Sequence, residues 1–276
     1  MFKYSYDALV YYGEKVDESI KRLAKFGYDA IELVGEPDYY DSKEVRKLCA
    51  EYGIKVSSIC SVYNSARDLA HPDLAKRRQA IDYVKKIADF SAEVGAPTMI
   101  VAPTACNKTQ ALAADRDEHQ WAVEGMREGG EYAAKLNVKL CIEAWNRYET
   151  YMCNRLDQAR TFMKDINLPN VGIMGDTFHM NIEEPDMAEA IRQSKDGLIH
   201  IHLADTNRAA PGIGHMDYLP ILKALKEIDY QGYLTFEILP AAADPFGVMR
   251  KGGHKDFFDN YTGQCIKYIK EIEKQL

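Results

Sequence analysis

VGIMGDTFHMNIEEPDMAEAIRQSKDGLIHIHLA, residues 171–204, is the stretch that decides the fold. It begins and ends with short apolar runs rich in Val, Ile and Leu, which are typical of buried β-strands. Between them lies a longer segment whose apolar residues recur at helical spacing. The order strand, helix, strand predicts two parallel strands joined by a right-handed crossover.

The same alternation runs through the whole chain. Helices are expected at 17–27 and 41–53, with Asp41 as an N-cap and Gly27 and Gly53 as stop signals. Further helical patterns cover 73–94, 120–136, 155–167, 186–194, 218–228 and 259–274. The sequence predicts strands at 2–6, 30–34, 55–61, 98–102, 139–144, 171–177, 198–204 and 233–239.

Eight strand–helix units in 276 residues predict an α/β fold, a single (β/α)8 TIM barrel that occupies residues 1–276 as one domain. A doubly wound open sheet is the alternative. That fold favours a glycine-rich phosphate turn after the first strand, where this chain has SYDALVYYGE at 5–14. Neither a GxGxxG after the first strand nor a GxxxxGK[ST] motif is found, so no nucleotide cofactor is expected. The pair Gly212 and Gly214 is interpreted as part of a flexible loop.

The amino-acid composition and charge indicate which kinds of molecule the protein is not expected to bind and where in the cell it is expected. The 35 basic and 42 acidic residues give a net charge of −7, which argues against binding to nucleic acid or to an anionic membrane. The chain contains neither a signal region at its start nor an apolar run of the ~18 residues that a membrane span needs. Six cysteines are scattered without a CxxC pair, which predicts reduced thiols and a cytoplasmic protein.

Each of the last four predicted strands ends on a side chain that can bind a metal: Glu143, Asp176, His202 and Glu237. If their faces point into the barrel, the four side chains converge at one rim. Three carboxylates packed together repel each other and raise their own pKa values, and a divalent cation removes that cost. Oxygen ligands with one imidazole favour Mn²⁺, Mg²⁺ or Co²⁺. His200, two residues deeper, is interpreted as an interior histidine that does not ligate the metal.

The segments around these side chains resemble the ketose 3-epimerase family, typified by D-tagatose 3-epimerase, within the xylose-isomerase-like TIM barrels. The resemblance rests on EAWNRYETYMCN (143–154), GDTFHMNIEE (175–184), HIHLADTNRAAPGIGHMDY (200–218) and FEIL (236–239). It implies that the four side chains bind a divalent metal, most simply Mn²⁺, and that Glu143 and Glu237 are also the catalytic acid/base pair. It further implies that Glu149, His179 and Arg208 contact the sugar, and that the protein forms a homodimer or homotetramer.

The reaction implied is inversion of C3 in a free ketose such as tagatose, psicose, fructose or ribulose. A proton is removed to give an enediolate and is returned from the opposite face, which is work for two carboxylates. An aldose–ketose isomerase of the hydroxypyruvate type and an epimerase or lyase acting on a 3-keto-glycoside are alternatives. A nuclease and a non-catalytic sugar-binding barrel fit less well, because the chain is acidic and has two acid/base-competent carboxylates at the metal.

Two segments depart from the family pattern. Residues 102–120 lack the tryptophan that the family often has after its fourth strand, and ILPAAADPFGVMRKGG (238–253) adds residues after Glu237. Both segments border the expected sugar pocket, so the departures bear on which substrate binds.

Overall fold

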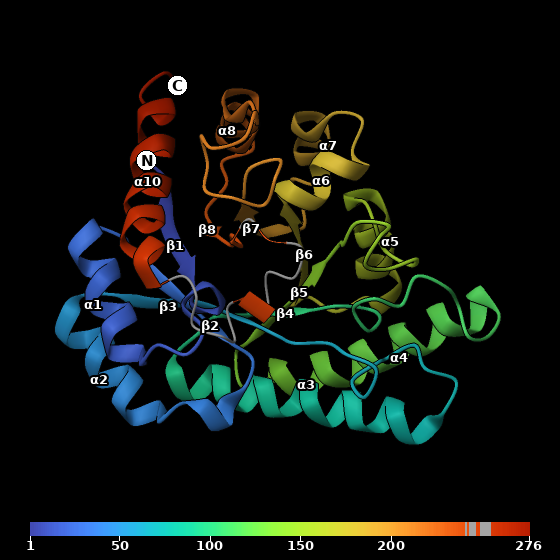
Figure 1. The fold of residues 1–276 in the computed structure, drawn as a ribbon. Coiled ribbons are helices and arrows are strands. Elements are labelled where there is room, and N and C mark those ends of the chain that lie inside the picture. The colour runs from blue at the N-terminus through green and yellow to red at the C-terminus, as the bar shows by residue number, and fades with distance from the viewer. Residues whose placement is uncertain (241, 243–246, 249–254) are drawn as a thin grey trace.

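Eight parallel strands close into a barrel in chain order, with β1 paired to β8 (Figure 1). The structure, a computed structural model, describes residues 1–240, 242, 247–248 and 255–276. Much of the added segment after Glu237 therefore lies outside the described residues. The strands are β1 (Lys3–Asp7), β2 (Ala30–Val34), β3 (Lys55–Cys60), β4 (Thr98–Val101), β5 (Lys139–Glu143), β6 (Val171–Asp176), β7 (Leu198–Leu203) and β8 (Tyr233–Phe236). Closure of the sheet confirms the barrel and excludes the open-sheet alternative.

Helices lie around the outside of the barrel (Figure 1). They are α1 (Val16–Phe26), α2 (Ser42–Tyr52), α3 (Leu74–Val94), α4 (Asp115–Ala134), α5 (Leu156–Ile166), α6 (Thr177–Glu183), α7 (Met187–Gln193), α8 (Tyr218–Glu227) and α10 (Lys255–Glu273). The short helix α6 and the 3₁₀ turns η1 (Ala8–Tyr11) and η2 (Pro37–Tyr39) were not predicted, and α4 begins five residues before its predicted start. The turns η1 and η2 and the helix α6 begin within three residues of the end of a strand and are too short to show a repeat of apolar residues in the sequence.

The predicted helix signals act as expected. Gly27 and Gly53 end α1 and α2 with φ of 78° and 68°, in the left-handed region that glycine adopts without a steric penalty. The Asp41 carboxylate caps α2 by accepting hydrogen bonds from the backbone N–H groups of Lys43 and Glu44. These local signals fix where each helix begins and ends.

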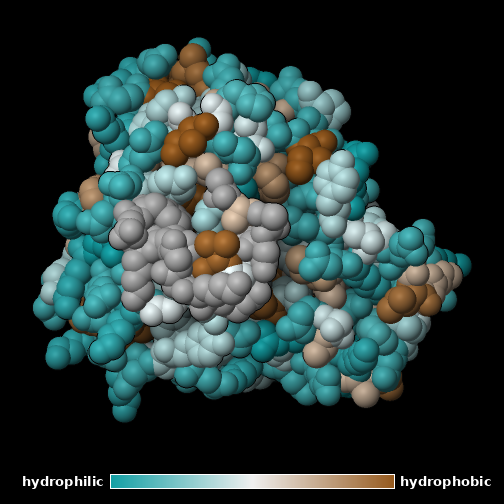
Figure 2. Space-filling view, in the orientation of Figure 1, coloured by the Kyte–Doolittle hydropathy of each residue, from teal (hydrophilic) through white to brown (hydrophobic). Residues whose placement is uncertain are grey.

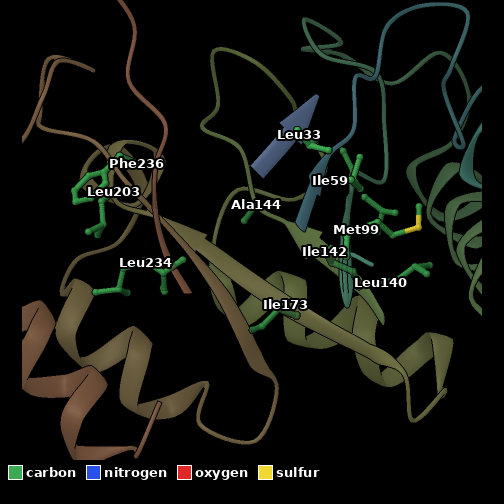
Figure 3. Close-up of a cluster of buried hydrophobic side chains, with 14 of the residues drawn as sticks. Leu33, Ile59, Met99, Leu140, Ile142, Ala144, Ile173, Leu203, Leu234 and Phe236 are labelled. Atoms are coloured by element: carbon green, nitrogen blue, oxygen red, sulfur yellow. The ribbon is translucent and has the colours of Figure 1, made fainter. Parts of the chain in front are cut away.

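Side-chain alternation in the strands builds two layers. One face of each strand packs apolar residues against the helices, as Leu140, Ile142 and Ile173 do in Figure 3. The other face points into the barrel, where Cys141 and Met174 belong to a small apolar cluster. Since Glu143 and Asp176 lie on the same faces as Cys141 and Met174, the strands direct these carboxylates into the barrel mouth.

The two chain ends lie close together, because the Phe2 backbone N–H donates to a carboxylate of Glu273 in α10. The visible face in Figure 2 is mostly hydrophilic, with scattered apolar side chains. No helix in the described part of the chain is both long and apolar enough to cross a membrane. The six thiols are free, and all except the half-buried Cys106 are buried, which agrees with the prediction of reduced cysteines.

Candidate active site

The four predicted ligands meet at the carboxyl ends of β5 to β8. Glu143, Asp176, His202 and Glu237 are all buried, and one ligand atom from each lies within 4.8 Å of the others. His202 Nδ1 is 3.0 Å from Glu237 Oε2, 3.8 Å from Asp176 Oδ2 and 4.0 Å from Glu143 Oε1. Three carboxylates and one imidazole nitrogen aimed at a common point form a donor set that fits a divalent cation such as Mn²⁺ or Mg²⁺.

A fifth buried carboxylate, which the sequence did not single out, orients the histidines. Glu32 on β2 is fully buried, and its Oε1 lies 2.8 Å from His202 Nε2, an ion-pair contact that is not aligned as a hydrogen bond. Its Oε2 lies 2.9 Å from His200 Nε2 and also accepts a hydrogen bond from Ser58. Because Nε2 of His202 faces Glu32, its Nδ1 is the nitrogen left to face the cluster. His200 lies in the barrel interior, as predicted.

The two carboxylates expected to act as the acid/base pair sit in opposite electrostatic environments. Burial raises the pKa of Glu143 to about 8, and the charges of Glu237 and Asp176 add to this rise. Burial also disfavours the charge on Glu237, but Arg208 and His202 outweigh it and hold the pKa of Glu237 well below its ordinary value. The two neighbouring carboxyl groups therefore differ in proton affinity because their charged neighbours differ.

Arg208 supplies positive charge to the cluster. Its guanidinium donates to Asp176 Oδ2 at 2.6 Å and to Glu237 Oε2 at 2.5 Å, and it packs over the ring of Phe178 at 4.7 Å. The residue has a φ of 63°, which is uncommon for a side chain larger than glycine and recurs at functional sites. Arg208 is thus held against two of the predicted ligands.

The loop that carries Arg208 is folded around one carboxylate. Asp205 accepts hydrogen bonds from the backbone N–H groups of Thr206, Gly212 and Met216. A Cβ atom on Gly214 would lie 2.1 Å from Asp205 Oδ1, so this approach requires glycine. Gly212 and Gly214 were interpreted from the sequence as part of a flexible loop. In the structure both lie against the Asp205 carboxylate, so this loop has a defined packing.

His179 presents one defined nitrogen to the cluster. Its Nδ1 accepts a hydrogen bond from the backbone N–H of Asn146 at 3.2 Å, and a backbone N–H can only donate. The neutral ring therefore carries its proton on Nε2, which lies 3.8 Å from Asp176 Oδ2 and 4.0 Å from Glu143 Oε1. Burial lowers the pKa of His179, which favours this neutral form. His179 is placed to donate a hydrogen bond to an oxygen in the cluster.

Glu149 completes the predicted set from the loop after β5. Its Oε1 accepts from the Asn146 side-chain amide at 3.0 Å and lies 4.0 Å from His179 Nδ1. Its Oε2 faces the thiol of Cys106 at 3.7 Å. The structure thus brings together all seven residues that the sequence singled out, and Asn146 is a further member that links Glu149 to His179.

A cavity of about 930 Å³ opens above the cluster. Glu143, Glu149, His179, Arg208 and Glu237 line one end. Trp145, which follows β5, also lines the cavity, whereas Trp121 lies on α4 beneath the guanidinium of Arg77. The loop after β4 contributes Cys106 to the lining. Such a cavity has the size of a small-molecule site.

Fold and cluster together define a (β/α)8 barrel with a candidate divalent-cation centre at the carboxyl ends of its strands. A family model described as xylose isomerase-like TIM barrel matches residues 20–252. The chain therefore belongs to the xylose isomerase-like TIM-barrel family, as the resemblance implied.

Curated relatives and solved structures agree with that assignment. A ketose 3-epimerase of Arthrobacter globiformis is 30% identical, with 93% of this chain and 94% of that protein covered. The 3-dehydro-D-guloside 4-epimerase of Escherichia coli is 29% identical, with 85% of this chain and 91% of that protein covered. A D-allulose 3-epimerase from Methylomonas sp., solved in complex with D-allulose, superposes with a TM-score of 0.87 at 28% identity, with 98% of this chain and 96% of that chain covered. These relatives are epimerases of keto-sugars, so the expected enzyme class, an isomerase, is confirmed.

Proposed function

We propose that the protein is a metal-dependent epimerase that inverts the carbon beside the carbonyl group of a keto-sugar. One observation carries the proposal: Glu143, Asp176, His202 and Glu237 converge, buried, at the floor of a cavity of about 930 Å³, which is large enough to admit a sugar. Epimerase relatives that cover nearly the whole chain support it. The first candidate substrate is a free ketose such as tagatose, psicose, fructose or ribulose, inverted at C3.

The chain's own residues have distinct roles in this proposal. Glu143, Asp176, His202 and Glu237 hold the cation, most simply Mn²⁺, with Mg²⁺ or Co²⁺ as alternatives. When bound, such a cation polarises the ketone and stabilises the negative charge that develops as the neighbouring carbon loses its proton. Its oxygen-rich donor set, with one imidazole held by Glu32, supports this assignment.

Glu143 and Glu237 move the protons. They come from β5 and from the end of β8, separated by the two strands that carry Asp176 and His202, and both line the cavity. One carboxylate removes the carbon-bound proton to give the enediolate, and the other returns a proton to the opposite face, which inverts the centre. Their roles exchange with the direction of the reaction.

Three further residues bind the sugar. His179 donates a hydrogen bond from Nε2, Arg208 donates from its guanidinium, and Glu149 accepts from a sugar hydroxyl. Asn146 positions His179 and Glu149 relative to each other through hydrogen bonds to both. These contacts hold the substrate oxygens while its carbon is deprotonated.

Deuterium exchange tests the reaction. A ketose panel is incubated in D₂O with Mn²⁺ and with EDTA, and the deuterated carbon is located by NMR. Label at C3 that disappears with EDTA supports the epimerase, whereas label at C1 indicates an aldose–ketose isomerase. Glu143→Gln and Glu237→Gln are expected to abolish net inversion. Substantial exchange surviving in both variants rules out the acid/base assignment.

A 3-keto-glycoside is the second candidate substrate. The cavity, at about 930 Å³, lies at the upper end of the range of about 300–1,000 Å³ that drug-sized ligands occupy. The Escherichia coli relative that acts on 3-dehydro-D-guloside supports the same substrate class. On such a substrate the enolisation chemistry is unchanged, and loss of an aglycone after enolisation would make the enzyme a lyase.

The proposal also includes the domain organisation, the oligomeric state and the cellular location of the enzyme. It takes residues 1–276 as one domain, a homodimer or homotetramer as the assembly and the cytoplasm as the location. Size-exclusion chromatography with light scattering tests the assembly, and cell fractionation tests the location.

A further inference from the structure

The cavity extends far beyond the candidate metal cluster. Its inner end is formed by residues at or just after the ends of β5 to β8, and its lining continues over the ends of β2 and β3 and the segments that follow β1, β2 and β3. We call the part lined by Tyr12, Asp17, Glu36, Tyr39 and Glu44 the outer chamber. These residues belong to the segments after β1 and β2, on the half of the barrel mouth that carries none of the predicted ligands.

Two aromatic rings of the outer chamber are available for binding. Tyr12, just after η1, is 40% exposed, and Tyr39, the last residue of η2, is 69% exposed. No hydrogen bond of either hydroxyl is found within the described residues. Tyr40, beside Tyr39, is held in place by stacking on Phe90 at 5.5 Å. Exposed tyrosine rings at a cavity rim offer flat apolar faces on which a sugar or aryl ring can stack.

The charges of the described lining residues disfavour an anionic ligand group in the outer chamber. The described lining residues include eight carboxylates but only two permanent cations, Lys15 and Arg208. Arg208 bonds to the metal cluster at the inner end. The nearby Arg67 pairs with Glu36 at 2.6 Å. Lys15, beside Tyr12 and Asp17, is the one lining cation in the described part of the outer chamber. A phosphate group there would therefore meet more carboxylates than cations, whereas an uncharged hydroxylated group would find hydrogen-bond acceptors.

We propose that the outer chamber binds the non-reacting part of a neutral glycoside, so that the substrate is a keto-sugar ring linked to a second, uncharged ring. This inference rests on the proposed function with its second candidate substrate, the keto-glycoside, because the reacting ring must lie at the metal cluster. A free ketose would leave the outer chamber without a ligand. The second ring is either aryl or glycosyl, since both present an uncharged face to Tyr12 and Tyr39.

Paired substrates test the inference. Exchange in D₂O is measured with methyl, phenyl and glucosyl 3-keto-β-D-glucosides, a free ketohexose and a ketohexose phosphate. We expect kcat/KM to be about tenfold higher for a ring-bearing glycoside than for the methyl glycoside, since one stacked ring contributes about 1.4 kcal/mol. The phenyl and glucosyl compounds distinguish the two kinds of second ring. Equal kcat/KM for all glycosides, or a preference for the ketohexose or its phosphate, overturns the inference.

Single substitutions test whether the preference for a ring-bearing glycoside comes from the outer chamber. Tyr39→Ala is expected to lower kcat/KM for the preferred ring-bearing glycoside about 5- to 10-fold and to leave the methyl glycoside unchanged. Tyr148→Ala is the matched control, because Tyr148 is similarly exposed at 71% and lies outside the cavity lining. An equal loss on both substrates, or the same loss in the control variant, contradicts the assignment of the outer chamber.

A binding measurement separates this inference from the proposed function. Unoxidised phenyl and methyl β-D-glucosides, which have no ketone to react, are titrated calorimetrically into the Mn²⁺-loaded protein. Tighter binding of the phenyl compound that is lost in Tyr39→Ala supports the outer chamber even if no substrate exchanges deuterium. Exchange without such a binding difference supports the epimerase and refutes the outer chamber.

Discussion

Replacing Glu32 by glutamine tests the geometry of the candidate metal centre without touching a ligand. Glutamine has nearly the same shape as glutamate, so the substitution leaves the fully buried site filled. It removes the negative charge 2.8 Å from His202 Nε2 and 2.9 Å from His200 Nε2. The variant therefore changes how His202 and His200 are held and how strongly His202 donates to a cation, while the four predicted ligands keep their side chains.

The expected loss follows from the role of such outer carboxylates. Removing a group that orients a ligating histidine costs roughly 10- to 100-fold in metal affinity, or about 1.4–2.7 kcal/mol. Mn²⁺ affinity is measured by competition with a chromogenic chelator on metal-stripped protein. We expect Glu32→Gln to weaken binding within that range while the circular dichroism spectrum stays unchanged.

Glu118→Gln provides the matched control. Glu118 is also fully buried and also has a cationic partner, Lys108 at 2.5 Å, but it lies on α4 outside the metal cluster. The control variant is expected to keep the metal affinity of the unchanged protein. If Glu32→Gln binds Mn²⁺ within twofold of the unchanged protein, or if both variants lose affinity equally, the proposed role of Glu32 is refuted.

Three other predictions follow from the same structure. Arg208→Met is expected to raise Mn²⁺ affinity about tenfold in the absence of sugar, because the guanidinium competes with the cation for Asp176, and to lower kcat/KM for the sugar. Mn²⁺ at 100 times its Kd is expected to stabilise the protein by about 2.7 kcal/mol, seen as a rise in Tm of roughly 5–10 °C by differential scanning fluorimetry. Lys108→Met is expected to cost about 3–5 kcal/mol in urea unfolding at pH 7, because it leaves the buried carboxylates of Asp68 and Glu118 without their cation.

The stability of the Lys108→Met variant is also expected to depend on pH in a characteristic way. Burial alone would raise the pKa of Glu118, but Lys108, Tyr151 and two backbone N–H groups hold it below the ordinary value of 4.5. A carboxyl group with a lowered pKa stabilises the fold above its ordinary pKa and loses that contribution as the pH falls through the lower value. Acid unfolding below pH 4.5 is therefore expected to be less steep in Lys108→Met, and an identical acid profile would contradict this.

Weaker Mn²⁺ binding in Arg208→Met would show that the arginine supports the centre instead of competing for it. An unchanged Tm on addition of Mn²⁺ would argue against the cation site as a whole. Asp176→Asn serves as the control for that shift, since it removes one carboxylate ligand and is expected to reduce the rise in Tm.

The barrel and the candidate metal cluster were predictable because each depends on a repeated local pattern. Apolar runs that alternate with helical segments fix the order of strands, and Glu143 and His202 each end such a run. Asn146 could have been noticed between Glu143 and Glu149, but its contact with His179 spans 33 residues. Contacts of that kind depend on how separate loops fold over the barrel mouth.

Glu32 escaped prediction for a different reason. In the stretch AIELV (30–34), Glu32 is a single charged residue in a short predicted strand. The two histidines that it contacts lie on β7, more than 160 residues away in the chain. A charged residue in the middle of an otherwise buried strand is the signal that could have found it, since such a position is costly unless the charge is paired. The 3₁₀ turns η1 and η2, which shape the outer chamber, have no comparable signal.

The division of the barrel mouth has an evolutionary consequence. The residues proposed to move protons and to hold the cation come from the later strands, whereas Tyr12 and Tyr39 come from the first two connections of the chain. Recombination within a gene can therefore replace the early segment and alter which compound is accepted, as long as the new segment keeps a carboxylate in the place of Glu32, which contacts His202. Laboratory chimaeras that exchange only the beginning of the chain among relatives offer a direct route to new specificities.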